Sequence, residues 1–293
     1  MPTSIQFQKI IWTYYRAHPR PMPWRRARDR RDPYRILVSE IMLQQTQVAR
    51  VVGFYEKFIK LFPDFGTLAQ AKTPDVLRAW QGLGYNRRAL ALQKLAKEVL
   101  EKYSGRLPRD AASLIVLPGV GPYTAGAIRA FAFNEPEIFI ETNIRRVFIH
   151  FFFSSAQMAA QNKKNTKKTG GKVTDEAIRR YIERTIDRKN PREWYWALMD
   201  YGAMLGEAAR GKNDRKNGGK TSTAIENPNR RSAHYVRQSK FVGSDREIRG
   251  KILRELLAKP KISTKTLPAR IVDGLVKDGF ILQKGRYIKL VGG

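Results

Sequence analysis

The segment SEIMLQQTQV, residues 39–48, places a carboxylate and several amides where their spacing could build a site. Glu40, Gln44 and Gln47 are separated by four and three residues, so on an α-helix they share one face, while the apolar residues of the segment fall on another. Such a polar face either meets water or lines a site. In the second case Glu40 is the residue able to transfer a proton.

The segment LPGVG, residues 117–121, indicates a tight turn between two helices. Gly119 and Gly121 flank Val120, and Pro122 can begin the second helix, whose small residues follow. Backbone N–H groups at a helix N-terminus attract anions without any side-chain charge. The segment is therefore either a phosphate site or a plain helix–helix turn.

The charge of the chain favours nucleic acid as the anion. Its 293 residues include 56 Lys and Arg against 26 Asp and Glu, a formal charge of +30, and this excess repels itself unless a polyanion offsets it. An acidic membrane surface is the competing partner. However, we find neither an apolar run of about 18 residues nor a signal peptide. We expect a soluble, intracellular protein.

The absence of cysteine limits the possible cofactors. With no cysteines, the chain cannot form disulfides, thiolate-ligated zinc or cysteine-ligated iron–sulfur clusters, and it cannot use a thiol nucleophile. The three histidines, His18, His150 and His234, are scattered along the chain, so a histidine metal site also lacks ligands. We expect no metal and no cofactor.

Hydrophobic periodicity predicts a mainly α protein. Amphipathic segments broken by Gly and Pro recur along most of the chain, and strand signals are scarce. Pro33 is placed to open one of the helices. The expected helices cover 5–17, 34–47, 48–61, 74–80, 87–103, 110–116, 122–132, 142–153, 174–187 and 191–205.

Three segments depart from this pattern. Residues 154–172 and 206–224 are rich in Lys, Asn and Gly, which predicts basic loops that are either solvated insertions or phosphate contacts. Residues 244–293 predict a helix with a Ser244/Glu247 capping box, a second helix, and two strands around Lys284 and Gly285. This order suggests a small winged-helix-like module, and the alternative is a helical tail docked on the main domain.

Six ordered motifs over residues 20–205 resemble one family. They are PMPWR, DPYRILVSEIMLQQTQV, WQGLGYNRRALAL, LPGVGPYTAGAI, FIETNIRRVF and WALMDYGAML. In this order and spacing, the sequence resembles the helix-hairpin-helix (HhH-GPD) superfamily of base-excision-repair DNA glycosylases, and within it the MutY-type adenine DNA glycosylases. The resemblance implies a two-lobed, all-helical glycosylase fold acting on double-stranded DNA with a mismatched or damaged base.

The resemblance implies a role for each residue of the first motifs. Glu40 would protonate an adenine flipped out of the duplex, which near neutral pH requires burial to raise the pKa of a glutamate. Gln45 would fill the gap, Gln44 would contact the opposite strand, and Tyr85 with Leu83 would wedge the helix open. The resemblance also implies DNA contacts for Arg25 and for the Gly119–Val120–Gly121 loop.

The hairpin position Tyr123 predicts the type of reaction. Related glycosylases that also nick the strand carry a Schiff-base lysine at this position, and this chain does not. The resemblance therefore implies a monofunctional N-glycosylase without AP-lyase activity, with Tyr123 hydrogen-bonding near the reacting groups.

The second carboxylate departs from the family pattern. Where the family has aspartate before an asparagine, this chain has Glu141, with Asn143 and Arg145 retained. The charge that stabilises an oxocarbenium-like sugar is kept on a longer stem. Glu141 could be a compensated substitution, a sign of a different substrate, or a mark of lost activity.

The chain also departs from the family after residue 205. The four cysteines that hold an iron–sulfur cluster in most relatives are missing, and Arg230, Arg231 and Arg237 are candidates to supply the DNA contacts of that region. Residues 244–293 are too short and too helical to be the family's β-rich 8-oxoguanine-sensing domain.

The expected organisation is therefore a catalytic domain over 1–205, a basic loop over 206–243 and the module over 244–293. The catalytic domain would comprise a six-helix lobe of about 34–140 and a second lobe from 1–33 and 141–205, which carries the 154–172 insertion. We expect a monomer in the prokaryotic cytoplasm, associated with the nucleoid, that excises adenine opposite guanine or 8-oxoguanine. The alternatives are a thymine or uracil mismatch glycosylase and a catalytically impaired DNA-binding homologue.

Overall fold

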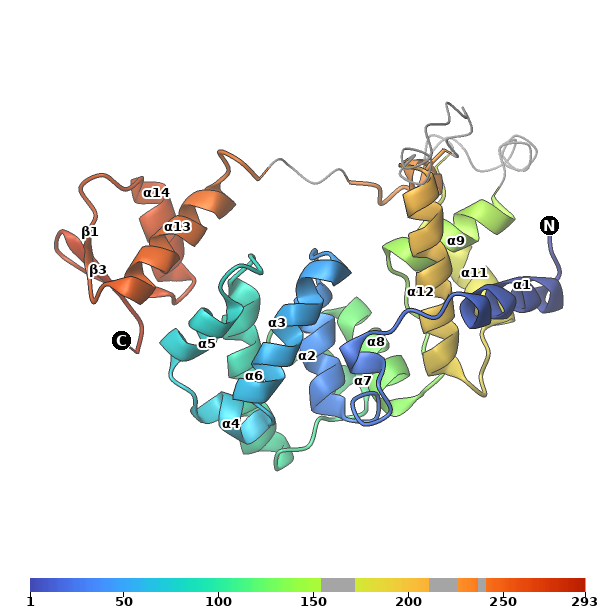
Figure 1. Ribbon diagram of the computed structural model, residues 1–293, viewed down its shortest axis with the longest axis horizontal. Helices are drawn as coiled ribbons and strands as arrows, with labels where there is room; N and C mark the ends of the chain where they lie inside the picture. The colour runs from blue at the N-terminus through green and yellow to red at the C-terminus, as the bar shows by residue number, and fades with distance from the viewer. Residues whose placement is uncertain (154–171, 211–225, 237–240, 293) are drawn as a thin grey trace. The chain divides into compact units, whose positions relative to one another are not determined.

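The protein is mainly α-helical, as the sequence predicts (Figure 1). The computed structural model describes residues 1–153, 172–210, 226–236 and 241–292. Residues 154–171 of the expected basic insertion, most of the 206–224 loop and Arg237 lie outside the described residues. No helix within the described ranges is long and apolar enough to cross a membrane.

The chain divides into two compact units. Unit 1 comprises Met1–Pro21 and Ala125–Arg237, and unit 2 comprises Met22–Thr124 and Gln238–Gly293. The divisions at 21/22 and 124/125 fall inside the catalytic domain expected over 1–205, and the division at 237/238 falls in the expected loop over 206–243. The expected lobe boundaries, at 33/34 and 140/141, and the separate domain over 244–293 stay predictions.

Unit 1 is built around the pair α9 (Thr142–Phe152) and α12 (Pro191–Ala208), which pack against each other. Helices α1 (Ser4–Ala17) and α11 (Asp175–Thr185) pack on this pair, and the short helix η2 (Pro228–Arg231) lies against α9 (Figure 1). Phe7 of α1 contacts the rings of Phe148, Phe152 and Trp194 at centroid distances of 5.0–5.9 Å. This aromatic core fixes the helix that begins after Glu141.

Unit 2 contains the helices that carry most of the motif residues. Its helices between residues 22 and 124 are η1 (Pro23–Arg25), α2 (Pro33–Leu43), α3 (Val48–Leu61), α4 (Phe65–Gln70), α5 (Thr73–Trp80), α6 (Arg87–Tyr103), α7 (Ala111–Ile115) and the first turn of α8 (Pro122–Phe133). Helix α6 packs on α2, α4 and α5, and its apolar face is buried. Helix α4 was not expected; the Asp64 side chain caps its start by accepting from the Thr67 N–H.

Helix α2 ends four residues earlier than the sequence predicts. Asp32 caps its start and Pro33 is its first residue, as expected, but the helix stops at Leu43 and Gln45 has a φ of 55°. The predicted single helical face of Glu40, Gln44 and Gln47 is therefore wrong. The cause is Arg88 of α6, a buried arginine that donates hydrogen bonds to the last carbonyls of α2.

The C-terminal residues of unit 2 form the predicted winged-helix-like module. Helices α13 (Asp245–Ala258) and α14 (Ala269–Lys277) pack on an antiparallel sheet of β1 (Ile262–Ser263), β2 (Ile281–Lys284) and β3 (Tyr287–Leu290), in the order β1-β3-β2. Strand β1 was not expected, because two residues carry no alternation.

The predicted capping box at the start of α13 is wrong. Ser244 is the N-cap residue but makes no side-chain cap; its hydroxyl donates to the Phe241 carbonyl. The Glu247 carboxylate accepts instead from the Gly243 N–H, one residue before the position that a capping box uses.

Candidate active site

Glu40 is a buried carboxyl group on the last turns of α2. Its exposed fraction is 7%, and its neighbours Ser39 and Ile41 are fully buried. The apolar residues of α2 hold the helix against α3 and α6, so the position of Glu40 is set by a packed helix rather than by a loop. A buried carboxyl group on a rigid element is suited to general acid catalysis.

Arg88, at the start of α6, ends α2 and holds the loop that follows. Its Nη1 donates to the carbonyls of Ile41, Met42 and Gln44 at 2.8, 2.8 and 2.5 Å. Its Nη2 donates to Thr46 Oγ1 at 3.0 Å and to the Gly84 carbonyl at 3.1 Å. Burial lowers the pKa of Arg88 to about 10. One guanidinium therefore fixes both the 44–46 loop and the 81–85 loop.

Arg88→Lys is expected to destabilise the protein by about 3 kcal/mol, because a single ammonium cannot reach acceptors on two loops and leaves several buried carbonyls unpaired. Thermal or denaturant unfolding measures the change. Arg78→Lys is the matched control, since Arg78 makes an exposed pair with Asp75 and should change stability by less than about 1 kcal/mol. Equal stabilities of the two variants would contradict this role of Arg88.

The proposed wedge residues Gln45, Leu83 and Tyr85 lie together in unit 2. All three line one cavity of about 390 Å³. Gln45 and Tyr85 have φ values of 55° and 49°, a left-handed conformation that is uncommon for residues other than glycine. Leu83 is buried, whereas Gln45 is exposed and Tyr85 half-buried. Residues in strained backbone conformations are frequent at functional sites. In this protein, Arg88 holds the two short loops that carry them.

The hairpin loop between α7 and α8 is tied to the end of α2. Gly119 has a φ of 80°, and a Cβ there would lie 3.0 Å from the Ala91 side chain, so the turn requires glycine. The Val120 N–H donates to the Leu117 carbonyl at 3.1 Å and closes the turn. Gln44 Nε2 donates to the Gly119 carbonyl at 3.4 Å and to Thr124 Oγ1 at 3.2 Å. Gln44 thus links α2 to the hairpin.

Other site residues of unit 2 lie on short, well-defined elements. Tyr123 is the second residue of α8 and is half-buried, and Gly121 directly precedes that helix. Arg25 ends the short helix η1, where Pro23 and Trp24 are buried.

Glu141 is the N-cap residue of α9 in unit 1. Its Oε1 accepts from the backbone N–H groups of Asn143 and Ile144 at 2.6 and 2.7 Å, and its Oε2 accepts from Asn143 Nδ2 at 3.4 Å. Glutamate is an unusual cap because shorter side chains reach these N–H groups more easily. The longer stem is accommodated here, and the carboxylate is held in one orientation at a helix N-terminus, where negative charge is favoured.

A second buried arginine supports this carboxylate. Arg146 Nη1 donates to Asn143 Oδ1 at 2.6 Å and to the Gly202 carbonyl at 2.5 Å, so it fixes the amide that contacts Glu141. Burial raises the pKa of Glu141 above its usual value, while the two backbone N–H groups and then Arg146 and Arg145 act in the opposite direction. Arg145 also pairs with Asp175 at 2.7 Å.

Gly202→Ala is expected to destabilise unit 1 by about 3 kcal/mol or more, because overpacking against backbone cannot be relieved by a rotamer change. A Cβ at this position of α12 would lie 2.7 Å from the Asn143 Cβ and closer still to the Asn143 carbonyl oxygen. Thermal unfolding tests this effect. Gly53→Ala in α3 is the control: nothing lies within 4 Å of its Cβ, so we expect a gain of about 0.5–1 kcal/mol. Gly202→Ala with unchanged stability would refute the close packing of α9 on α12.

Residues 226–236 occupy the sequence region where relatives hold an iron–sulfur cluster. The chain has no cysteine, and no group of three His, Asp or Glu residues in the described ranges could hold a metal, so the residues present do not fit such a cluster. Instead, Asn229 Nδ2 donates to the Thr142 carbonyl at 2.9 Å. Val173 and Ser232 form an isolated parallel β-bridge. This segment is therefore hydrogen-bonded to the start of α9 through Asn229.

The two described arginines of that segment differ in their surroundings. Arg231 donates to the Phe153 carbonyl at the C-terminal end of α9, while Arg230 is exposed. Burial and then the charge of Arg231 lower the pKa of His150, a half-buried residue of α9.

The pKa shift of His150 predicts acid sensitivity. Because the folded-state pKa lies below the unfolded value of about 6.5, protons bind the unfolded chain first as the pH falls below 6.5, and stability is lost in that range. His150→Phe should therefore reduce the loss of melting temperature between pH 7 and 5. An unchanged pH profile in this variant would show that His150 does not contribute.

The structure thus brings together Gln44 with the hairpin, Gln45 with Leu83 and Tyr85, and Glu141 with Asn143. The first two groups and Glu40 belong to unit 2, and the third belongs to unit 1. Sequence reasoning missed Arg88 and Arg146, the two buried arginines that hold these groups. The only signal for each was its place in a motif, NRRALAL or NIRRVF, beside a second arginine.

The comparisons define the class of protein to which this fold and site belong. Residues 38–176 match the family model described as HhH-GPD superfamily base excision DNA repair protein. Among relatives, the adenine DNA glycosylase of Mycolicibacterium smegmatis is 30% identical over 289 residues, which cover 91% of each chain. The human adenine DNA glycosylase is 42% identical over 205 residues, 68% of this chain and 36% of the human one. The chain belongs to the adenine DNA glycosylase family of the HhH-GPD superfamily.

Other similarities are shorter or more distant. The adenine DNA glycosylase of Buchnera aphidicola is 34% identical over 70% of this chain, which spans 54% of that protein's length. A thermostable thymine-DNA glycosylase has a TM-score of 0.57 at 28% identity, with 69% of this chain and 86% of that chain covered. A trapped endonuclease III–DNA covalent intermediate, at 19% identity and a TM-score of 0.53 over 70% of this chain and 88% of that one, shares the fold.

Proposed function

We propose that this chain is a base-excision-repair DNA glycosylase that hydrolyses the N-glycosidic bond of adenine mispaired with guanine or 8-oxoguanine. The observation that supports this most is the buried carboxyl group of Glu40 within the SEIMLQQT motif of a chain from this family. The substrate is double-stranded DNA, and the excess of 30 positive charges suits it. We further propose a cytoplasmic, nucleoid-associated monomer from a prokaryote.

Glu40 acts as the general acid in this proposal. A purine is a poor leaving group as an anion, so a proton from Glu40 to the flipped adenine lets the base leave neutral. Flipping costs a few kcal/mol of stacking and pairing. Gln45, Leu83 and Tyr85 offset that cost by occupying the opened stack, which agrees with all three lining one cavity.

Glu141 stabilises the positive charge that develops on the sugar. As the bond from C1′ to the base breaks, a nearby carboxylate lowers the energy of the oxocarbenium-like transition state. Asn143 and Arg146 hold Glu141 in one orientation, so the longer side chain costs little additional freedom. Water then forms the new C1′–O bond, adenine leaves with the proton from Glu40, and the proton lost by the water restores Glu40.

Tyr123 at the lysine position of strand-nicking relatives supports a monofunctional enzyme. Without an amine nucleophile, no Schiff base forms and the product is an intact strand with an abasic site. Arg25, Arg230, Arg231, Arg237 and the Gly119–Val120–Gly121 loop are proposed to contact the DNA backbone. No iron–sulfur cluster takes part in this proposal.

A single-turnover assay tests the proposed function. Duplexes with A opposite G or 8-oxoG are incubated with excess protein and divided, and one half is treated with alkali to cleave abasic sites. We expect strand cleavage only after alkali. Cleavage without alkali would contradict the monofunctional assignment, and no cleavage in either half would contradict the activity.

Thymine opposite guanine is the second candidate substrate. The structural similarity to a thermostable thymine-DNA glycosylase at 28% identity favours it over other bases, and uracil is its close analogue. G·T and G·U duplexes in the same assay decide between them: we expect slower cleavage than for A·G, and the reverse order would assign the chain to pyrimidine mismatches.

A noncatalytic DNA-binding homologue is the remaining alternative, because Glu141 replaces the family's aspartate. In that case the parent would bind duplex DNA without excision, and Glu141→Asp would restore turnover.

A further inference from the structure

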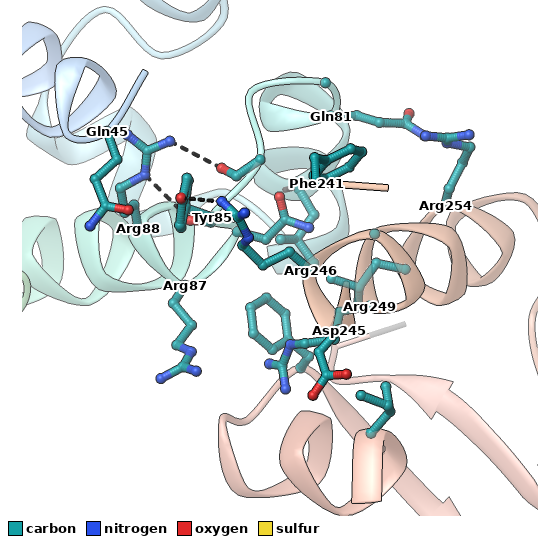
Figure 2. A pocket seen from close by; sticks show the side chains of 18 of the residues that line it. Gln45, Gln81, Tyr85, Arg87, Arg88, Phe241, Asp245, Arg246, Arg249 and Arg254 are labelled. Atoms are coloured by element: carbon teal, nitrogen blue, oxygen red, sulfur yellow. Dashed lines mark hydrogen bonds between the residues drawn. The ribbon is translucent and has the colours of Figure 1, made fainter. Parts of the chain in front are cut away.

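A cavity of about 780 Å³ in unit 2 lies where the C-terminal module meets the wedge loops (Figure 2). One wall includes Gln45, Arg50, residues 81–82 and residues 84–88, and the other includes residues of α13 and α14 with Phe241. Its volume falls in the range of sites that hold drug-sized ligands, so one nucleotide fits inside. The proposed function uses only the wedge loops and leaves the opposite wall without a role.

The lining of this cavity is strongly basic. It includes seven arginines and one carboxylate, Asp245. Asp278 pairs with both Arg87 and Arg249, and Asp245 pairs with Arg270 at 2.5 Å. Among the residues that the structure describes, Arg50 of α3 and Arg254 of α13 have no carboxylate partner, and both are exposed. Guanidinium groups that outnumber the carboxylates around one cavity favour a polyanionic ligand.

Aromatic rings accompany these charges. Figure 2 shows the Tyr85 ring between the guanidiniums of Arg88 and Arg246, which lie 5.4 and 5.3 Å from its centroid. Arg246 also donates a hydrogen bond to Tyr85 Oη, so the module directly contacts a wedge residue. Phe241 is 57% exposed on the same cavity. Basic groups interleaved with aromatic rings are the combination that binds a nucleic-acid strand, through phosphates and stacked bases.

We propose that this cavity binds one strand of the DNA, with phosphates held by Arg50, Arg246 and Arg254 and a base against the exposed ring of Phe241. The inference rests on the proposed function for its partner, DNA, and adds a site in which the C-terminal module takes part. A free nucleotide is a weaker fit, because Gln45 and Tyr85 line the cavity and are the residues proposed to enter the duplex. The module therefore extends the strand-binding surface next to the wedge.

The salt dependence of binding gives the first test. The slope of log K against log salt is negative, and each lost phosphate contact makes it shallower by about 0.9. For Arg50→Ala/Arg254→Ala, we expect a slope that is less negative by about 2 and weaker binding of an A·G duplex by fluorescence anisotropy. Arg106→Ala is the control, because the exposed Arg106 follows the far end of α6, about 25 Å along the helix from Arg87.

Disulfide crosslinking gives the second test. Because the chain has no cysteine, an introduced cysteine is the only protein thiol that can form the crosslink. Arg254→Cys and Arg106→Cys are each mixed with duplexes that carry a thiol tether on one phosphate at a time. Arg254→Cys should crosslink at a few adjacent positions of one strand, and Arg106→Cys should not. No crosslink from Arg254→Cys, or the same pattern from both variants, would overturn the proposal.

The two tests separate this inference from the proposed function. If the parent excises adenine while the double variant keeps the parent's salt slope, the cavity is not a strand site and the enzyme assignment stands. If crosslinks form as expected while no base is released, the strand site stands and the enzyme assignment fails. Inhibition by a free nucleotide without crosslinking would identify a small-molecule site and contradict the inference.

Discussion

Glu40→Gln is expected to lower the single-turnover rate of adenine release by about 1,000-fold, within the range that general acid catalysis contributes. The amide matches the carboxyl group in size, so it fills the same buried position on α2, where the exposed fraction is 7%. It has no acidic proton to give to the leaving base. Affinity for the A·G duplex should stay within about threefold, because DNA affinity derives mainly from phosphate contacts.

The control for this variant is Glu56→Gln, which removes an exposed carboxylate of α3 paired with Arg26 at 2.8 Å. Its rate should equal that of the parent. Both variants should unfold within a few degrees of the parent. A Glu40→Gln enzyme as fast as the parent would remove Glu40 from the mechanism.

Glu141→Gln is expected to lower the same rate by about 100- to 1,000-fold, the usual loss when one preorganised electrostatic group is removed. The amide oxygen can still accept from the Asn143 and Ile144 N–H groups, so the cap of α9 is retained and only the charge is lost. Glu141→Asp keeps the charge and is a better helix cap. It should therefore retain at least the parent's stability.

The raised pKa of Glu141 adds a pH signature. Because burial disfavours its charged form, the contribution of Glu141 to stability is greatest below the unfolded pKa and is lost as the pH rises through the folded value. Glu141→Gln should remove this part of the pH dependence of unfolding. Parent-like rates from Glu141→Gln would assign the residue to capping alone and contradict its catalytic role.

The fold was predictable wherever one helix face is apolar over several turns. The starts of α2 and α6 at Pro33 and Arg87 agree with the sequence prediction. The end of α2 was not predictable, because it depends on Arg88, which is 47 residues from Ile41 in the chain. Helix α4 and strand β1 were also not predicted, because they are stabilised by contacts with neighbouring elements.

The candidate site was predictable for residues that motifs carry and not for their supports. Glu40, Glu141 and Asn143 follow from motif positions alone. That Glu141 caps α9, and that Arg146 links Asn143 to Gly202, depends on packing between helices that are 56 residues apart in sequence. The Arg246–Tyr85 contact joins residues 161 apart, which no local pattern indicates.

The most direct test of the central claim is the identity of the base released. The parent protein is incubated in excess with equal amounts of A·8-oxoG, A·G, G·T and G·U duplexes, and free bases are measured by mass spectrometry. We predict free adenine as the main product, formed in proportion to alkali-labile sites in the adenine strand. Release of thymine or uracil in its place, or of no base from DNA that the protein binds, would contradict the assignment of this chain as an adenine glycosylase.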